Sequence, residues 1–393
     1  MIRLHGVEGH EEARAALARA HAAAGLPASM LIHGPRGVGK QRMALWAGQL
    51  LLCQAPGPEG PCDTCRGCRL ALGLEHPDLH WYFPLPRPKG VRGDRLADAL
   101  ESERIDALAE IRKAPLRPSV GGELRGLYLG VVQSLRRKAR MAPTMAGVQV
   151  FVLADAELLV PQESSPEAAN ALLKLLEEPP PRTHLILTSS EPGRLLPTIR
   201  SRSVPLHLSP LPRDRVEAFL RRHRELDGET ARWAADLAQG AIGRALGFLP
   251  DGDDPPPLEE LRKGALALVD AALADGLAPG YALALERSSS KARKLVPLFS
   301  FVEEWLRDVS AVAAGAEDRV LNRDSVDHLR RAVERAGVEP ADAARALTAA
   351  ESARQRARGN VNPQLLLSGL VRELRSALRP RRVPTHGATG RGP

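Results

Sequence analysis

The four cysteines of this 393-residue chain have the spacing of a metal site. They are Cys53, Cys62, Cys65 and Cys68. Two-residue gaps let neighbouring thiolates point at one cation, and four thiolates complete the tetrahedral shell of a structural zinc ion. The alternatives are two disulfides, free thiols or another metal. The opening sequence has acids where a secretion signal needs an apolar core, and disulfides are rare in a reducing compartment, so zinc is favoured.

The residues around the cysteines also predict the shape of this site. Prolines and glycines surround the ligands and favour tight turns without a helix. They are Pro56, Gly57, Pro58, Gly60, Pro61 and Gly67. We therefore expect residues 53–68, which we call the zinc knuckle, to form a loop between two helices that the bound metal holds together.

A glycine-rich loop just before the cysteines has the pattern of a phosphate-binding Walker A motif. Its candidate nucleotide-binding residues are Gly34, Gly37, Gly39, Lys40 and Gln41. The apolar segment 29–33 predicts a buried strand before the loop, and segment 42–52 predicts a helix after it. Backbone N–H groups of such a loop close around phosphate, and the lysine reaches the outer phosphates. Gln41 differs from the motif, which needs a Ser or Thr hydroxyl for the magnesium ion. A glycine-rich turn without a ligand is the alternative.

The acids that a hydrolysing site needs are incomplete. The apolar run 148–153 predicts a second buried strand, which ends in Ala154 and Asp155. At the end of such a strand one acid holds magnesium and the next lies beside the attacking water. Asp155 matches only the second acid, because Ala154 occupies the first position. Since Gln41 also lacks a hydroxyl, the sequence predicts very weak hydrolysis or none, and it leaves nucleotide binding open.

One arginine lies between two further predicted strands. The apolar runs 184–188 and 204–208 predict these strands, and Arg202 stands between them in the sequence Ser-Arg-Ser. A guanidinium gives permanently charged, bidentate contact with phosphate oxygens. Without further context, one of 55 basic residues is more simply a solvated surface charge.

The elements that must position these residues predict an α/β fold. Near-continuous apolar runs between helical segments are typical of a parallel sheet covered on both faces. A helix before the prolines at 179–181 is expected to begin with Ser165 as N-cap and Pro166 in its first turn. The acidic, proline-rich stretch 251–257 predicts a linker. We expect a P-loop domain at 1–210, a small helical lid at 211–250, an all-helical domain at 258–378 and a basic, disordered tail at 379–393.

The segment 84–126 has the composition of an insertion, rich in Pro, Arg and Gly around a helix expected at 98–113. A run of basic residues follows it. These residues are Arg136, Arg137, Lys138 and Arg140. Such runs are usually solvated faces, and contact with a phosphate backbone is the alternative.

The composition limits the classes of function. The formal net charge is +8, which allows an anionic partner without demanding one. Aromatic residues make up only 3%, which argues against the stacking platforms of dedicated single-strand binders, so nucleic-acid contact should be mostly to phosphates. No run approaches the roughly 18 apolar residues of a membrane span, and we expect a cytoplasmic protein.

In this order the motifs resemble those of one family, the AAA+ clamp-loader subunits of bacterial DNA polymerase III. The resemblance covers most of the first 250 residues. Besides the loop and the cysteines it includes His-Pro-Asp at 76–78, the stretch 170–180 and Ser-Arg-Ser at 201–203. The family normally has Cys where this chain has Ser203. The loss of catalytic residues is similar to a non-hydrolysing subunit and not to the gamma or tau motor subunits.

The resemblance implies a fold and a set of roles. It implies an AAA+ P-loop domain with an inserted zinc knuckle, a helical lid and a C-terminal oligomerising collar. Arg202 would be the catalytic arginine finger, reaching in trans to the γ-phosphate of ATP held by a neighbouring motor subunit. Arg244 lies where the second sensor arginine of the family contacts nucleotide in its own site. The implied partners are gamma or tau and delta subunits in a hetero-oligomeric ring, the sliding clamp, and primed DNA through its phosphates.

The function implied is therefore loading of the sliding clamp during DNA replication, by a subunit with weak or absent ATPase activity. Two other classes of function stay open at this point. One is an active ATPase, either a motor subunit of the same loader or another P-loop enzyme. The other is a zinc-dependent nucleic-acid-binding protein.

Overall fold

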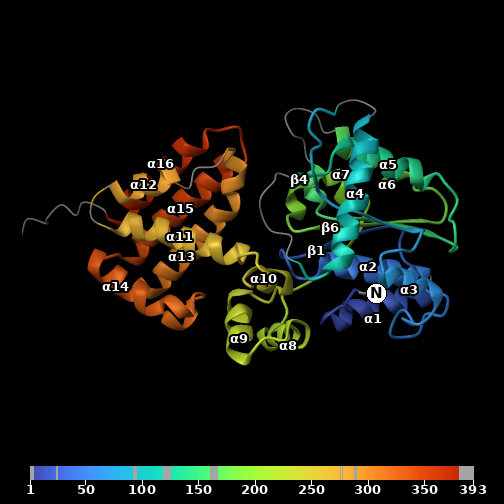
Figure 1. The fold of residues 1–393 in the computed structure, drawn as a ribbon, viewed down its shortest axis with the longest axis horizontal. Coiled ribbons are helices and arrows are strands. Elements are labelled where there is room, and N and C mark those ends of the chain that lie inside the picture. The colour runs from blue at the N-terminus through green and yellow to red at the C-terminus, as the bar shows by residue number, and fades with distance from the viewer. Residues whose placement is uncertain are drawn as a thin grey trace, which may run out of the picture. The chain divides into compact units, whose positions relative to one another are not determined.

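The structure is a computed structural model that describes residues 4–23, 25–91, 95–117, 125–159, 167–274, 276, 278–286 and 290–379 (Figure 1). The expected N-cap Ser165, Pro166 and the tail beyond Arg379 lie outside these residues. The chain divides into two compact units, 1–254 and 255–393. Within the described ranges, no helix combines the length and apolar character that crossing a membrane requires.

The first unit is built on a five-stranded parallel sheet in the order β2-β5-β6-β1-β7. Its strands are β1 Ser29–His33, β2 Leu79–Tyr82, β5 Gln149–Leu153, β6 Thr183–Ser189 and β7 Val204–His207. All residues of β5 are buried, and only the last residue of β1 is partly exposed. Continuous burial requires helices on both faces of the sheet, which explains why β1 and β5 are apolar runs without alternation, whereas most of the edge strand β7 is exposed. The predicted α/β fold with a parallel sheet is confirmed.

Helices cover both faces of this sheet. They are α1 Glu11–Ala23, α2 Lys40–Leu52, α3 Arg66–Leu72, α4 Arg95–Lys113, α5 Leu129–Ala139, α6 Glu167–Glu177 and α7 Pro197–Ser201. Two short 3-10 turns, η1 Ala156–Leu159 and η2 Pro192–Arg194, follow β5 and β6. Helix α4 begins three residues before the expected start at Asp98.

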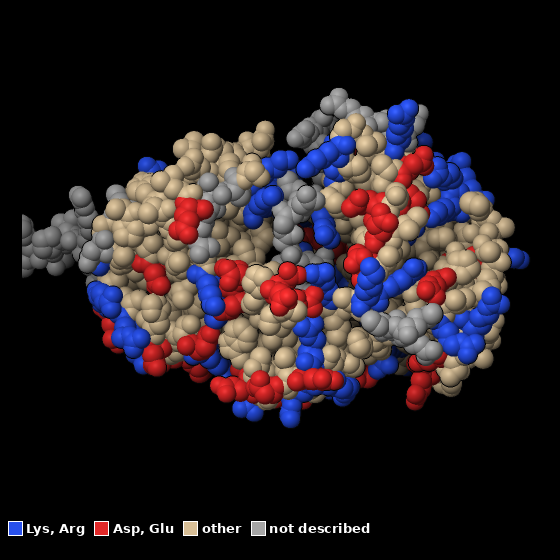
Figure 2. Space-filling view, viewed as in Figure 1, with Lys and Arg blue, Asp and Glu red and all other residues tan. Residues whose placement is uncertain are grey.

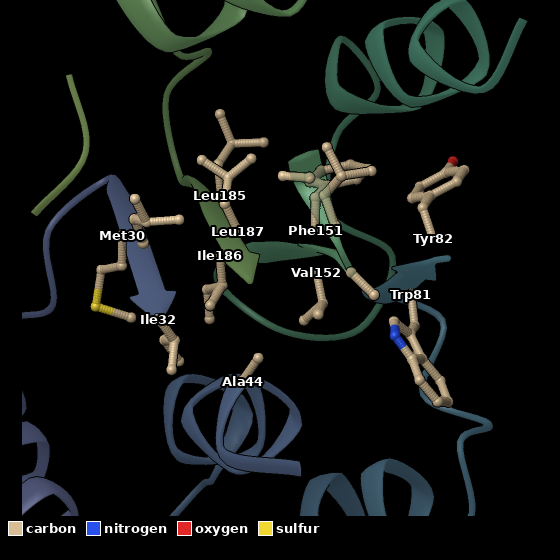
Figure 3. Packing of buried hydrophobic residues seen from close by; sticks show 14 of the residues in the cluster. Met30, Ile32, Ala44, Trp81, Tyr82, Phe151, Val152, Leu185, Ile186 and Leu187 are labelled. Carbon is tan, nitrogen blue, oxygen red and sulfur yellow. The ribbon is translucent and has the colours of Figure 1, made fainter. Parts of the chain in front are cut away.

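The core shows how neighbouring residues of one strand reach opposite faces of the sheet. In Figure 3, Ile186 of β6 points towards Ala44 of α2, whereas Leu185 and Leu187 point to the other side. Ala44 is completely buried. Helix α2 also approaches the sheet closely at Gly48, where a Cβ atom would lie 2.8 Å from the Leu79 side chain. This packing fixes the helix that follows the glycine-rich loop.

The lid and the second unit are entirely helical in their described residues. The lid contains α8 Arg213–Arg224, α9 Gly228–Leu237 and α10 Ile242–Gly247, packed around its own apolar cluster. The second unit contains α11 Pro257–Leu273, α12 Ala278–Glu286, α13 Val296–Ala313, α14 Val326–Ala336, α15 Pro340–Ala357 and α16 Pro363–Leu378, with the 3-10 turns η3 Ala292–Leu295, η4 Glu317–Arg319 and η5 Arg323–Ser325. The expected all-helical C-terminal region is confirmed.

Asp78, in the His-Pro-Asp sequence, organises the approach to β5. Its buried carboxylate accepts hydrogen bonds from three successive backbone N–H groups, at 2.6, 2.8 and 2.7 Å. The donors are Thr144, Met145 and Ala146. Burial alone would raise the pKa of Asp78, but these N–H groups outweigh it and lower the pKa. The role of this acid is structural.

The segment 84–126 is attached to the sheet by a charged network. Its short strands β3 Leu85–Pro86 and β4 Arg125–Gly126 pair antiparallel. On α4, Glu101 accepts hydrogen bonds from Arg104 (2.6 Å) and from Lys138 of α5 (2.6 Å). Arg104 also donates to the carbonyl of Trp81 on the edge strand β2, at 3.2 Å. Glu101 therefore joins α4, α5 and the sheet edge.

The same network corrects part of the expectation for the basic run 136–140. Lys138 is not simply solvated, because its ammonium pairs with the largely buried Glu101. Arg137 forms only a long, exposed pair with Asp98, at 3.6 Å. Over the face seen in Figure 2, basic and acidic side chains lie interspersed.

Replacing Glu101 should weaken the first unit. Glu101→Gln removes the charge that Arg104 and Lys138 share, so we expect a loss of about 1–3 kcal/mol in the free energy of unfolding. Glu103→Gln is the matched control, since Glu103 is exposed on the same helix. Chemical denaturation followed by tryptophan fluorescence measures both, and equal effects of the two changes would contradict the proposed anchoring role.

The effect should depend on pH. Burial alone would raise the pKa of Glu101, but the hydrogen bonds from Arg104 and Lys138 lower it to about 2 from 4.5. A depressed folded-state pKa stabilises the protein above the unfolded pKa, and this stabilisation disappears as the pH falls through the folded value. The difference between wild type and Glu101→Gln should thus be largest above about pH 4.5 and shrink towards pH 2.

Candidate functional site

The glycine-rich loop lies at the carboxyl end of β1, directly before α2. Gly34 adopts a φ of +154°, and a Cβ atom there would lie 2.2 Å from the carbonyl oxygen of Leu208. Gly39, at φ +104°, is the N-cap of α2. Only glycine fits such close approach and left-handed geometry without strain. The predicted strand, loop and helix therefore occur in the order that a P-loop requires.

The side chain of Lys40 folds back and contacts the loop that precedes it. Its ammonium donates to the carbonyls of Gly34 (3.0 Å) and Pro35 (2.8 Å), and the residue is only 5% exposed. Burial lowers the pKa of Lys40 to about 8, although Asp155 and Glu157 act in the opposite direction. The ammonium of Lys40 is therefore held in place by the loop itself.

The altered residue Gln41 forms a hydrogen bond with Asp155, the one acid of the motif that this chain keeps. The side-chain amide of Gln41 donates to Asp155 Oδ2 at 3.2 Å. Burial, followed by the nearby Glu157, raises the pKa of Asp155. The neutral amide of Gln41 thus contacts the carboxyl group of Asp155. In the motif, position 41 carries a Ser or Thr hydroxyl, which binds magnesium together with an acid. Ala154, at the end of β5, is buried and offers no ligand atom.

Three polar residues at the ends of β5 and β6 belong to the same site and were missed in the sequence. Thr188 accepts a hydrogen bond from the backbone N–H of Asp155 at 3.1 Å. Glu157 is 6% exposed and accepts from the backbone N–H of Ser190 at 3.0 Å. The available signal was their position, because polar residues directly after parallel strands collect at one edge of the sheet.

The lid contacts the loop through backbone atoms. The N–H of Gly243, in α10, donates to the carbonyl of Gly37 at 2.9 Å. A Cβ atom on Gly37 would lie 2.7 Å from the backbone nitrogen of Arg244. The Arg244 guanidinium donates to the Leu237 carbonyl at 2.9 Å and lies 5.4 Å from the Phe248 ring centroid. Arg244 is therefore next to the loop, and its side chain contacts residues of the lid.

The four cysteines form a compact cluster. Their Sγ atoms all lie within 4.8 Å of one another, and the thiols form no disulfide. Cys62 and Cys68 are 3.9 Å apart between sulfur atoms, close to the roughly 3.8 Å that zinc–sulfur bonds of about 2.3 Å give in a tetrahedron. A hydrogen bond from the backbone N–H of Cys65 lowers the pKa of Cys62 to about 6, which favours a thiolate. The cluster can hold a metal ion.

The expected loop between two helices is present, from the end of α2 at Leu52 to the start of α3 at Arg66, but the expectation that residues 53–68 contain no helix is wrong. Helix α3 begins at Arg66, so Gly67 and Cys68 are helical. Its N-cap is Cys65, whose sulfur accepts a hydrogen bond from the backbone N–H of Cys68 at 3.4 Å. Gly67 is needed because a Cβ atom there would lie 2.4 Å from the carbonyl oxygen of Leu52. A cysteine thus starts the helix where Ser or Asp usually does.

Arg202 lies far from the P-loop of its own chain. It follows α7 and precedes β7, which pairs parallel with β1 from Met30↔Val204 to His33↔His207. The P-loop follows the last of these residue pairs, and Arg202 precedes the first. They therefore lie at opposite ends of the strands, that is, at the carboxyl-end and amino-end edges of the sheet, about 10 Å or more apart. The guanidinium pairs with Glu177 at 2.9 Å and is 36% exposed.

The glycine-rich loop, the parallel sheet and the helical lid define the chain as an α/β protein with a P-loop. Residues 9–212 match the family model described as DNA polymerase III, delta subunit. The chain belongs to this family.

Several relatives are DNA polymerase III delta' subunits. The chain is 31% identical to the delta' subunit of Escherichia coli over 226 residues, which are 58% of this chain and 55% of that protein. It is 36% identical to the Pseudomonas aeruginosa delta' subunit over 175 residues, 44% of this chain and 40% of the relative. A DNA polymerase III gamma/tau subunit of Mycobacterium tuberculosis is 27% identical over 259 residues, 66% of this chain and 37% of the relative. The chain thus spans about half the length of the delta' relatives it matches.

Replacing Gly37 by alanine should weaken the contact between helix α10 of the lid and the glycine-rich loop. Gly37→Ala places a Cβ atom against the backbone of Arg244, and we expect faster hydrogen exchange across residues 241–247 and lower stability. Gly25→Ala is the matched control, because both glycines have φ +82° but nothing lies within 4 Å of a Cβ at Gly25. The cost of holding an alanine at a positive φ angle, roughly 1–2 kcal/mol, is then the same in both variants. Equal exchange of the lid in both would refute the contact.

Proposed function

We propose that this chain is the delta prime subunit of the DNA polymerase III clamp loader, which loads the sliding clamp onto primed DNA during replication. Its part in the reaction is to supply Arg202 in trans to ATP bound by a neighbouring motor subunit. It hydrolyses little or no ATP itself. Membership of the delta subunit family and the delta' relatives support the role in the clamp loader.

The proposal that Arg202 acts on ATP of a neighbouring subunit depends mainly on one observation, the position of Arg202 relative to the P-loop of its own chain. Parallel pairing of β1 with β7 keeps the two at opposite edges of the sheet. A finger at that edge serves a nucleotide held by another subunit more readily than one held by its own. The guanidinium is also partly exposed, and its planar charge suits the developing charge on a transferred phosphoryl group.

The state of the P-loop supports the absence of hydrolysis. Gln41 and Asp155 hydrogen-bond to each other, and Ala154 supplies no acid, so two groups that hold magnesium are replaced. Gly34, Gly37, Gly39 and Lys40 keep the backbone and the ammonium that contact phosphate. Nucleotide binding without turnover is therefore compatible with the proposal, and Arg244 is the lid residue proposed to contact such a ligand.

The proposal assigns the remaining parts and partners. The P-loop domain is 1–210, the lid 211–250, the oligomerising collar 258–378 and the basic tail 379–393. The collar would join gamma or tau and delta subunits in a hetero-oligomeric ring in the cytoplasm. DNA would be contacted through its phosphates, in keeping with a net charge of +8 and few aromatic residues.

Removing the finger should slow the assembled ring. We expect Arg202→Ala to lower ATP turnover of a ring of motor subunits plus this chain by about tenfold or more, within the roughly 10³–10⁵ that arginine fingers supply. Arg200→Ala is the matched control, because Arg200 is an exposed arginine on the short helix α7, which ends just before Arg202. Turnover is measured at matched assembly, checked by size-exclusion chromatography.

An unchanged rate in an assembled Arg202→Ala ring would reject the finger. The chain alone should show no turnover with ATP and magnesium. Steady turnover that Lys40→Ala abolishes would instead establish the alternative of an active ATPase. Salt-sensitive DNA binding by the chain alone, lost together with the metal, would favour the alternative of a nucleic-acid-binding protein.

The cysteine cluster should bind one zinc ion with a structural role. We propose Cys53, Cys62, Cys65 and Cys68 as its ligands, because four thiolates suit zinc among common cellular metals. Elemental analysis should give one zinc per chain for wild type and for Glu59→Gln, an exposed change in the same loop. Cys68→Ser should lose the metal and become susceptible to proteolysis near residues 53–68. Full zinc content in Cys68→Ser would contradict the assignment.

A further inference from the structure

Arg202 is held against its own domain by two contacts. One terminal nitrogen, Nη2, pairs with Glu177 Oε1 at 2.9 Å. The other, Nη1, donates to the backbone carbonyl of Thr198 at 3.2 Å. Both ends of the guanidinium fork are therefore in use. To contact a phosphate with this fork, Arg202 must release the carboxylate.

The place of Glu177 in the fold is unfavourable for a carboxylate. Glu177 is the last residue of α6, and Glu178 follows it. The carboxyl end of a helix carries partial negative charge and favours nearby cations. The negative charges of Glu177 and Glu178 are therefore repelled by this end of α6. Lys174 is the basic residue of the last turn, and Arg202 comes from outside the helix to pair with Glu177. The pair with Arg202 compensates for a carboxylate that the helix itself does not favour.

The exposure of the pair makes it easy to break. The side chains of Arg202 and Glu177 are 36% and 46% exposed. Ion pairs this exposed change an equilibrium constant by only about twofold to fivefold, because water screens the charges. Arg262 in the second unit is a contrast, since it pairs with Glu259 at 2.7 Å with both side chains only 8% exposed. A buried pair of that kind resists displacement by a ligand.

We propose that Glu177 is a positioning residue that holds Arg202 in a parked conformation, from which the terminal phosphate of a neighbouring subunit's nucleotide displaces it. This inference rests on the proposed function, because it needs Arg202 to act in trans. A terminal phosphate carries more charge than a carboxylate and offers several oxygens in the geometry of the guanidinium fork. Glu177 thus keeps the finger near the surface without fixing it there. Assembly with a nucleotide-bound neighbour supplies the competing anion.

The chain alone allows a direct test of parking. The probe is phenylglyoxal, which modifies accessible arginines, with the rate at Arg202 followed by peptide mass spectrometry. Glu177→Gln should raise this rate about twofold to fivefold. Glu178→Gln is the matched control on the adjacent residue and should leave it unchanged. Equal rates in wild type and Glu177→Gln would overturn the parked conformation.

The assembled ring tests the consequence. If parking competes with the phosphate, Glu177→Gln should raise kcat/KM for ATP about twofold to fivefold, because a larger fraction of fingers is free. The rise should vanish in the Arg202→Ala background, whereas a merely structural effect of Glu177 would persist there. Glu178→Gln again serves as the control.

The outcomes separate the two proposals. If Arg202→Ala slows the ring and Glu177→Gln behaves like Glu178→Gln, the finger stands and parking is overturned. If Glu177→Gln has the same effect with and without Arg202, its role is structural and parking is likewise overturned. If Arg202→Ala leaves the ring unchanged, the proposed function fails, and the Arg202–Glu177 pair is an ordinary surface ion pair.

Discussion

Parallel pairing of β1 with β6 on one side and with β7 on the other is the constraint on which both candidate sites depend. Because the strands run in the same direction, everything that follows a strand collects at one edge of the sheet and everything that precedes a strand collects at the other. The P-loop, Asp155 and Thr188 are brought together at the first edge. Arg202 is kept at the second. The separation of Arg202 from the P-loop of its own chain is therefore a property of the sheet.

At the P-loop edge, polar groups of the protein pair with one another. Lys40 contacts loop carbonyls, Gln41 contacts Asp155, and the backbone of Gly243 contacts Gly37. The ammonium of Lys40 is buried, and leaving it without a partner would cost more than an average hydrogen bond gains. These contacts join the loop, the sheet and the lid, whereas Glu157 Oε2 is buried at the same edge without a hydrogen-bond partner.

Charged anchors connect the peripheral parts of the first unit to this sheet. Glu101 ties the segment 84–126 to β2 through Arg104, and Asp78 holds the chain that enters β5. In contrast, the pair of Arg202 with Glu177 is exposed and weak. Glu101 and Asp78 are therefore shielded from water inside the domain, whereas the Arg202–Glu177 pair is open to it.

The sequence alone determined the features that depend on neighbouring residues. Apolar runs predicted strands β1, β5, β6 and β7, glycine spacing predicted the loop, and cysteine spacing predicted the metal cluster, because each pattern is local. Only the tertiary structure decided which distant side chains meet. The contacts of Gln41 with Asp155 and of Arg202 with Glu177 join residues from separate elements, and nothing in their spacing encodes them. The helix inside the cysteine knuckle was also decided there, since the Cys65 sulfur caps it and outweighs the turn-forming composition around it.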